Sequence, residues 1–106
     1  MLRSVEQRQK PTAGRDEDPR VTELRSAVSR LRRELAAHPA EFADRAIAEE
    51  ELAALHAMAE SGTPELLHLR RSLLLVAGAI GSVSALNPGV RRLREAIALF
   101  GEPRPN

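Results

Sequence analysis

The sequence predicts an all-α protein: an antiparallel three-helix bundle, or a helical hairpin, followed by a short fourth helix at the C-terminal end. Apolar residues make up 42% of the 106 residues and aromatic residues only 2%, so the core must be built from Leu, Ala, Val and Ile side chains. Apolar residues recur at alternating spacings of three and four, which is the repeat of an amphipathic helix. Strands would require more β-branched and aromatic residues than the chain contains.

The length of the chain suits one domain with a single core. Residues 1–17 mix charges and show no apolar period, so we predict a disordered N-terminal tail. The helical bundle domain is predicted over residues 18–101, and residues 102–106 are predicted to form a C-terminal tail. The first helix begins at Asp18, because its side chain suits the N-cap and Pro19 suits the first helical position.

Two apolar stripes define the first and second helices. Pro39 ends the first helix, because proline cannot continue a helix without losing a hydrogen bond. The apolar stripe of the first helix comprises Val21, Leu24, Val28, Leu31 and Leu35. The second helix is predicted from Ala40 or Asp44 to Glu60. Its apolar face comprises Ile47, Ala48, Leu52, Leu55, Met58 and Ala59.

The segment ESGTPEL ends the second helix and starts the third. Gly62 suits the left-handed position after a helix, Thr63 the next N-cap, and Pro64 the first turn of the third helix. Because the connection is short, the second and third helices are predicted to be antiparallel neighbours. The third helix is predicted to reach about Leu86, where Asn87–Gly89 break it. The short fourth helix then carries Val90, Leu93, Ile97 and Phe100 on one face.

The third helix contains an uncharged run, residues 72–86, that has no polar side. A membrane-spanning helix needs about 20 apolar residues, so this shorter run is predicted to be buried in protein. The first two helices cover two of its sides, and the remaining side requires the fourth helix or another copy of the chain. Small residues there would let two backbones approach closely. The predicted self-association surface comprises Ala77, Gly78, Gly81, Ser82, Ala85, Leu93, Ile97 and Phe100.

Three segments carry a resemblance to a known family. They are VSRLRRELAAHPAEFADRAIAEEELAAL, LRRSLLLVAGAIGSVSAL and REAIALFG. Together they resemble a family of short, all-helical actinobacterial proteins, a domain of unknown function common in streptomycetes. The resemblance covers roughly residues 18–101. It implies a helical fold, and it implies no catalytic or binding residue.

The candidate chemistry in the sequence is weak. The chain has no Cys, which excludes disulfides, thiolate metal sites and cysteine nucleophiles. Glu65 and His68 have the E-x-x-H spacing of di-iron bundles, but those sites need a second such motif and two further carboxylates. Residues 49–51 are three consecutive Glu, which point in different directions on a helix and indicate a solvated face. We therefore predict no enzymatic activity, no cofactor and no metal.

The predicted function is a non-enzymatic helical protein–protein interaction or self-association module, with a second copy or another helical protein as its partner. The N-terminal residues contain no apolar segment of the kind found in secretory signals, so a cytoplasmic location is expected. The alternative is a small DNA-binding or transcription-associated regulator that contacts phosphates through Arg91, Arg92 and Arg94. The net charge of +1 and the acidic second helix argue against a nucleic-acid partner. A membrane-associated helical protein ranks third.

Overall fold

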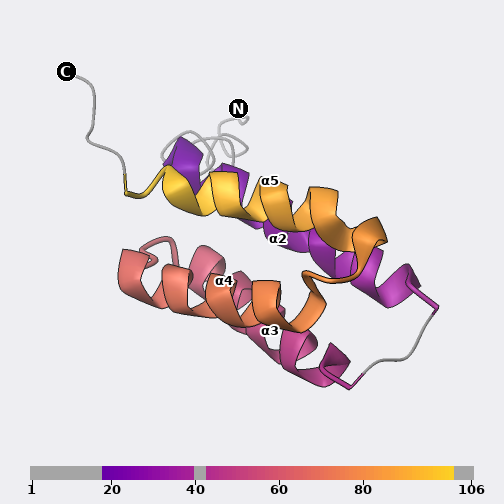
Figure 1. Cartoon of the computed structure of the whole chain (residues 1–106). Helices are drawn as coiled ribbons and strands as arrows, with labels where there is room; N and C mark the ends of the chain where they lie inside the picture. Colours follow the sequence, from indigo (N-terminus) through magenta and orange to yellow (C-terminus); the bar gives the residue numbers. More distant parts are fainter. Residues whose placement is uncertain (1–17, 40–42, 102–106) are drawn as a thin grey trace, which may run out of the picture.

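The computed structural model describes residues 18–39 and 43–101, and the predicted tails lie outside these ranges. Within the described residues the chain forms four α-helices, one short 3-10 helix and no strand, which confirms the all-α prediction (Figure 1). The elements are α2 (Pro19–Ala37), α3 (Arg45–Ser61), α4 (Leu66–Ile80), η2 (Ser84–Leu86) and α5 (Asn87–Ala98).

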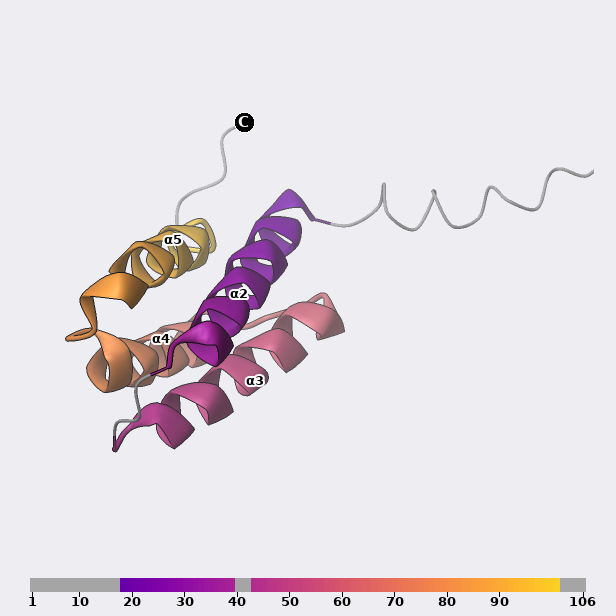
Figure 2. The same ribbon diagram turned by 90° about the vertical axis from the view of Figure 1, so that its right-hand side faces the viewer.

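The four helices form two layers. Figures 1 and 2 show α2 beside α5 in one layer and α3 beside α4 in the other. Each helix packs against two others, because α2 contacts α3 and α5 while α4 contacts α3 and α5. The predicted short fourth helix is therefore a full member of the bundle, and it covers α2 more than it covers α4.

Helix α2 begins at the predicted N-cap. The Asp18 carboxylate accepts a hydrogen bond from the backbone N–H of Arg20 at 2.9 Å, and Pro19 occupies the first turn, where its missing N–H costs nothing. The guanidinium of Arg20 also donates to Asp18 at 2.7 Å. This side-chain hydrogen bond raises the pKa of Arg20 above its usual value. The cap therefore joins a backbone hydrogen bond to a charge pair at one helix end.

Replacing Asp18 with Ala should lower the free energy of unfolding by about 1 kcal/mol, because the first turn loses its side-chain acceptor. Urea denaturation followed by circular dichroism measures the loss. Ser26→Ala is the matched control, because Ser26 is exposed in the middle of α2, where Ala favours the helix. Equal midpoints for Asp18→Ala and the wild type would contradict this account of the cap.

The opposite end of α2 is capped from α3. The Arg45 guanidinium donates to the backbone carbonyl oxygen of His38 at 3.0 Å and to that of Leu35 at 2.5 Å. Its Nε also donates to Glu49 at 3.2 Å. The last carbonyl groups of a helix lack the usual partner one turn later, and here the Leu35 oxygen accepts both from Arg45 and from the backbone N–H of His38 at 3.1 Å. Arg45 was not singled out in the sequence, where it looks like any charged residue near a helix start.

The turn between α3 and α4 follows the prediction at Gly62 and departs from it at Thr63. Gly62 has a φ of 81°, the left-handed conformation expected after a helix. The predicted start of the next helix is two residues early, because Glu65 precedes the first helical residue, Leu66. The backbone N–H of Thr63 donates to the Ser61 hydroxyl at 3.2 Å, which keeps Thr63 in the turn.

The predicted end of the third helix is wrong. Helix α4 ends at Ile80, and the chain turns at Val83, whose backbone is extended and whose N–H donates to the Ile80 carbonyl oxygen at 3.0 Å. Asn87 and Pro88, interpreted as a helix break, are the first residues of α5 instead. A proline in the first turn loses no helical hydrogen bond, so the same tripeptide that stops a helix can start one.

Gly89 sets the close approach of α5 to α2. A Cβ atom at this position would lie 2.8 Å from the Leu31 Cδ1 atom and 2.5 Å from the Glu34 Oε1 atom. A larger residue would therefore require the Leu31 and Glu34 side chains to shift. The core between the layers is aliphatic, and its largest fully buried side chains are Leu24, Leu31, Leu35, Leu52, Leu55, Leu69, Ile80, Leu86, Leu93, Ile97, Val21 and Val28.

Candidate interaction surface

The structure divides the predicted self-association residues between core and surface. Leu93 and Ile97 are buried inside the chain, because α5 packs its apolar stripe against α2. They therefore do not form a surface. Ala77 and Phe100 are partly buried and pack against the same core. The Arg20 guanidinium covers the ring of Phe100, 4.8 Å from its centroid.

The small residues around the end of α4 differ from one another. Gly78, Ser82 and Ala85 are exposed, whereas Gly81 is half-buried. A Cβ atom at Gly81 would collide with the carbonyl oxygen of Ala77, so this glycine is explained within the chain. A Cβ atom at Gly78 would meet nothing within 4 Å. Of the two glycines, only Gly78 has open space where a side chain would begin.

The largest exposed apolar side chains gather on one layer of the bundle. Among the described residues they are Ile47 (44% exposed), Leu67 (77%), Leu74 (72%) and Leu75 (41%). Ile47 belongs to α3 and the three leucines to α4, so none lies on α2 or α5. We call these four residues the hairpin face. None of the four was in the predicted surface, and Ile47, predicted on the apolar face of the second helix, is exposed instead.

Helix α4 presents a distinct outer ridge. Leu67, Arg71, Leu74 and Gly78 follow one another at spacings of four, three and four, so they lie along one side of the helix, and all four are exposed. The opposite side contains Leu69, Val76 and Ile80, which are fully buried. The sequence predicted that residues 72–86 have no polar side. The two leucines and the glycine of the ridge are uncovered, because α3 and α5 pack against other sides of α4.

A shallow groove of about 430 Å³ lies along the junction of α3 and α4. Its lining residues are Glu51, Ala54, Ala57, Met58, His68, Arg71, Ser72 and Leu75. The buried hydroxyl of Ser72 donates to the Glu51 carboxylate at 2.9 Å. This bond fixes the register of the two helices, because it is a polar contact beside a largely apolar interface.

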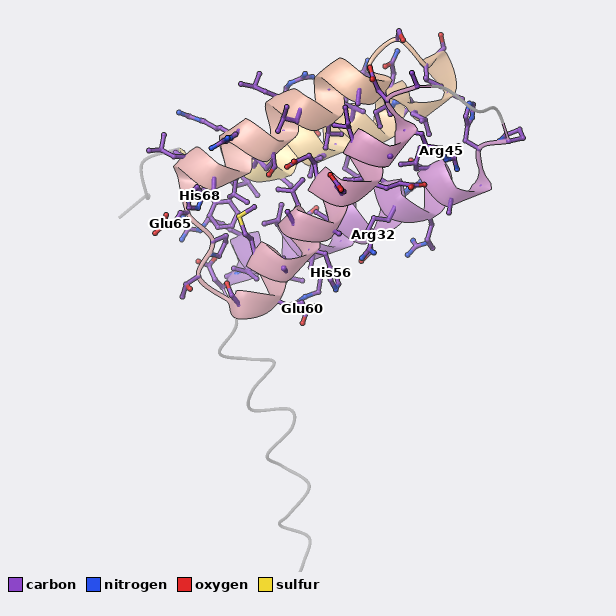
Figure 3. The ribbon with its side chains drawn as sticks, turned by 90° about the horizontal axis from the view of Figure 1, so that it is seen from below. Arg32, Arg45, His56, Glu60, Glu65 and His68 are labelled. Carbon is purple, nitrogen blue, oxygen red and sulfur yellow. The ribbon has the colours of Figure 1, made fainter. Side chains whose placement is uncertain are left out.

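The E-x-x-H pair does not converge on a metal site. His68 Nδ1 lies 3.4 Å from Glu65 Oε1, and both side chains are exposed. Figure 3 shows them at the start of α4, pointing away from His56 and Glu60 on α3. Among the described residues, no group of three or more His, Asp or Glu side chains is arranged to hold a metal ion.

The arginines of the DNA-binding alternative lie on the opposite layer. Arg91 and Arg94 are exposed on α5. Arg92 is partly buried and lines a groove of about 450 Å³ between α2 and α5 together with Glu23 and Glu95. Two carboxylates in the same groove reduce its positive potential, so the three arginines do not form a uniformly basic surface. No helix in the described part of the chain has the length and hydropathy of a membrane span.

Comparison with known proteins gives one positive finding. A protein-family model described as a family of unknown function (DUF5955) matches residues 13–101. No curated protein and no solved structure matches the chain. The family match includes every helix of the described bundle.

Proposed function

The chain belongs to this family of unknown function, DUF5955, and we propose that it is a helical self-association module without enzymatic activity. The contact surface in this proposal is the hairpin face, and the partner is a second copy of the chain. We place the module in the cytoplasm. The actinobacterial range of the family, implied by the sequence resemblance, stays an expectation.

The single observation that carries this proposal is the segregation of exposed apolar side chains. All the large ones among the described residues lie on α3 and α4, whereas the outward side chains of α2 and α5 are polar, charged or small. Fully burying a leucine side chain stabilises an association by about 1.5 to 3 kcal/mol. A contiguous apolar patch on one side of a small protein is typical of a surface that contacts protein.

A second copy suits this face better than a nucleic acid does. The ridge of α4 carries two leucines, one glycine and one arginine, which offers little for phosphate binding. Homo-oligomers most often form by a twofold axis that joins the same patch on both subunits. Because Leu67, Leu74 and Leu75 lie on α4 and Ile47 on the adjacent α3, such an axis can bring this side of both copies together.

Sedimentation equilibrium on three proteins tests the proposal: the wild type, Leu74→Glu and Ser26→Glu. We expect the wild type to have twice the chain mass of 11.6 kDa and Leu74→Glu to have 11.6 kDa. Leu74 is 72% exposed, so glutamate there leaves the fold of the single chain intact, which circular dichroism checks. Ser26→Glu introduces the same charge on the exposed surface of α2 and should leave the mass at the wild-type value.

A wild type that stays at 11.6 kDa up to high micromolar concentration would contradict self-association. Titration of a fluorescent DNA duplex then examines the alternative function. Binding that weakens steeply with salt and is reduced in Arg91→Ala and Arg94→Ala would support the regulator.

A further inference from the structure

We propose that two copies pair through the outer ridge of α4 in antiparallel orientation, with a twofold axis at the level of residue 76 that seats Leu74 of each copy on the partner's Gly78. This inference rests on the proposed function and adds the orientation and register of the contact. Three features of the described residues support it: the shape of the ridge, the distribution of charge along α4, and the place of Ile47.

The shape of the ridge is self-complementary about this axis. Leu74 is 72% exposed, and at Gly78 one turn later an added Cβ would meet no atom of its own chain within 4 Å, so a side chain of a partner can approach the backbone there. The two positions are equally far from Val76 along the helix. A twofold axis at the level of residue 76 therefore places each leucine on the other copy's glycine. Glycine at the contact lets helix axes approach to about 8 Å.

The charges of α4 select an antiparallel pairing. His68, Arg70 and Arg71 lie in its first half, and residues 72–80 carry no charge. A parallel pair in register would place Arg71 beside the partner's Arg71. The antiparallel pair places Arg71 beside the C-terminal end of the other α4, near Gly81, where the helix dipole carries partial negative charge.

The same charges select the register. An axis at the level of residue 76 separates the two Arg71 positions by about 15 Å along the helix, since 71 pairs with 81 at about 1.5 Å for each residue. That separation exceeds the Debye length of about 8 Å at physiological salt. An axis between 72 and 73 would instead seat Leu67 on the partner's Gly78. It would bring the two arginines within about 5 Å along the helix, and like charges would oppose the contact.

Ile47 widens the contact at the axis. The bond between Glu51 and Ser72 fixes the register of α3 against α4, and these helices run in opposite directions. One turn before Glu51 is therefore level with one turn after Ser72, which places Ile47 of α3 at the level of residue 76 of α4. Ile47, Leu74 and Leu75 then lie within one turn of the level of the proposed axis, and both copies contribute them.

Gly78→Leu separates the dimer contact from the fold. A Cβ atom at this exposed position meets no atom of its own chain within 4 Å and the change removes a glycine from a helix, so the thermal midpoint of the single chain should hold or rise. In the proposed dimer the new side chain occupies the place of the partner's Leu74, and sedimentation should give 11.6 kDa. A Gly78→Leu protein that still forms dimers would overturn the proposed register.

Single cysteines measure the orientation, because the chain has no cysteine of its own. Under mild oxidation Leu75→Cys should form a disulfide-linked dimer, since its two copies lie close to the axis. Leu67→Cys should not, because its two copies are about 27 Å apart along the helices, whereas a disulfide needs Cα atoms within about 7 Å. Both variants keep an uncharged residue at an exposed position, so the fold is retained.

The outcomes separate this inference from the proposed function. A monomeric wild type would remove both. A dimeric wild type in which Leu67→Cys is linked would overturn the antiparallel orientation and leave self-association standing. A dimeric wild type in which neither cysteine is linked would overturn the proposed register and leave self-association standing.

Discussion

Leu31→Ala should lower the free energy of unfolding by about 2 to 5 kcal/mol. Leu31 is fully buried in the middle of α2, which packs against both α3 and α5. Its Cδ1 atom lies against the backbone of Gly89, so the truncated side chain leaves a void that neither helix can close without moving the other. A domain of this size is stable by about 5 to 15 kcal/mol, so a large part of that stability would be lost.

Urea denaturation of Leu31→Ala and Ser26→Ala at one protein concentration measures this effect. Ser26 is exposed on α2 and lies outside the hairpin face, so its truncation should change stability by no more than about 0.5 kcal/mol. Similar losses for the two variants would mean that α2 does not occupy the centre of the bundle.

The inward stripes of the helices were predictable from the sequence alone. In α2 all five predicted apolar positions, from Val21 to Leu35, are buried. This helix has charged or small residues between its apolar ones, so a single period describes it. Leu73 in α4 follows the same apolar spacing as Leu69, Val76 and Ile80, yet it is only partly buried. Its helix lacks polar residues that would mark the outside.

The end of α4 could not be predicted, because local and tertiary effects disagree there. The apolar period continues through Val83, and Ser82 and Ser84 are compatible with a helix. Helix α4 ends at Ile80 because the chain turns back toward α2, and α5 then packs against both α2 and α4. The Asn87-Pro88-Gly89 sequence is equally consistent with a helix end and a helix start, and only packing distinguishes them.

The candidate surface was predictable only in outline. The absence of a polar side on α4 indicated an uncovered apolar surface, but which residues remain uncovered depends on where α5 lies. Leu93 and Ile97 were assigned to association because the short fourth helix was expected to leave part of the third helix uncovered. Leu67 and Leu74 are seven residues apart, a spacing that is also typical of a buried stripe, so the sequence could not reveal their exposure.

Arg45→Met should lower the free energy of unfolding by about 2 to 3 kcal/mol. The Arg45 side chain is only 14% exposed, and its guanidinium donates to the carbonyl groups of Leu35, in the last turn of α2, and of His38, which follows the helix. Hydrogen bonds to a charged group contribute about 1.5 to 3 kcal/mol, and the methionine stem retains the apolar packing of the arginine while removing the charged donor from both carbonyl groups. Urea denaturation at the concentration used for Leu31→Ala gives the comparison.

Two further variants identify which contact of Arg45 matters. Glu49 is 55% exposed, so Glu49→Gln, which removes only the ion pair, should cost no more than about 0.5 kcal/mol. Arg45→Lys keeps the charge but lacks the fork that reaches two carbonyl groups, so its stability should lie between those of Arg45→Met and the wild type. If Glu49→Gln were as destabilising as Arg45→Met, the ion pair would be the stabilising contact. The cap would then contribute little, and the junction between α2 and α3 would depend on salt concentration.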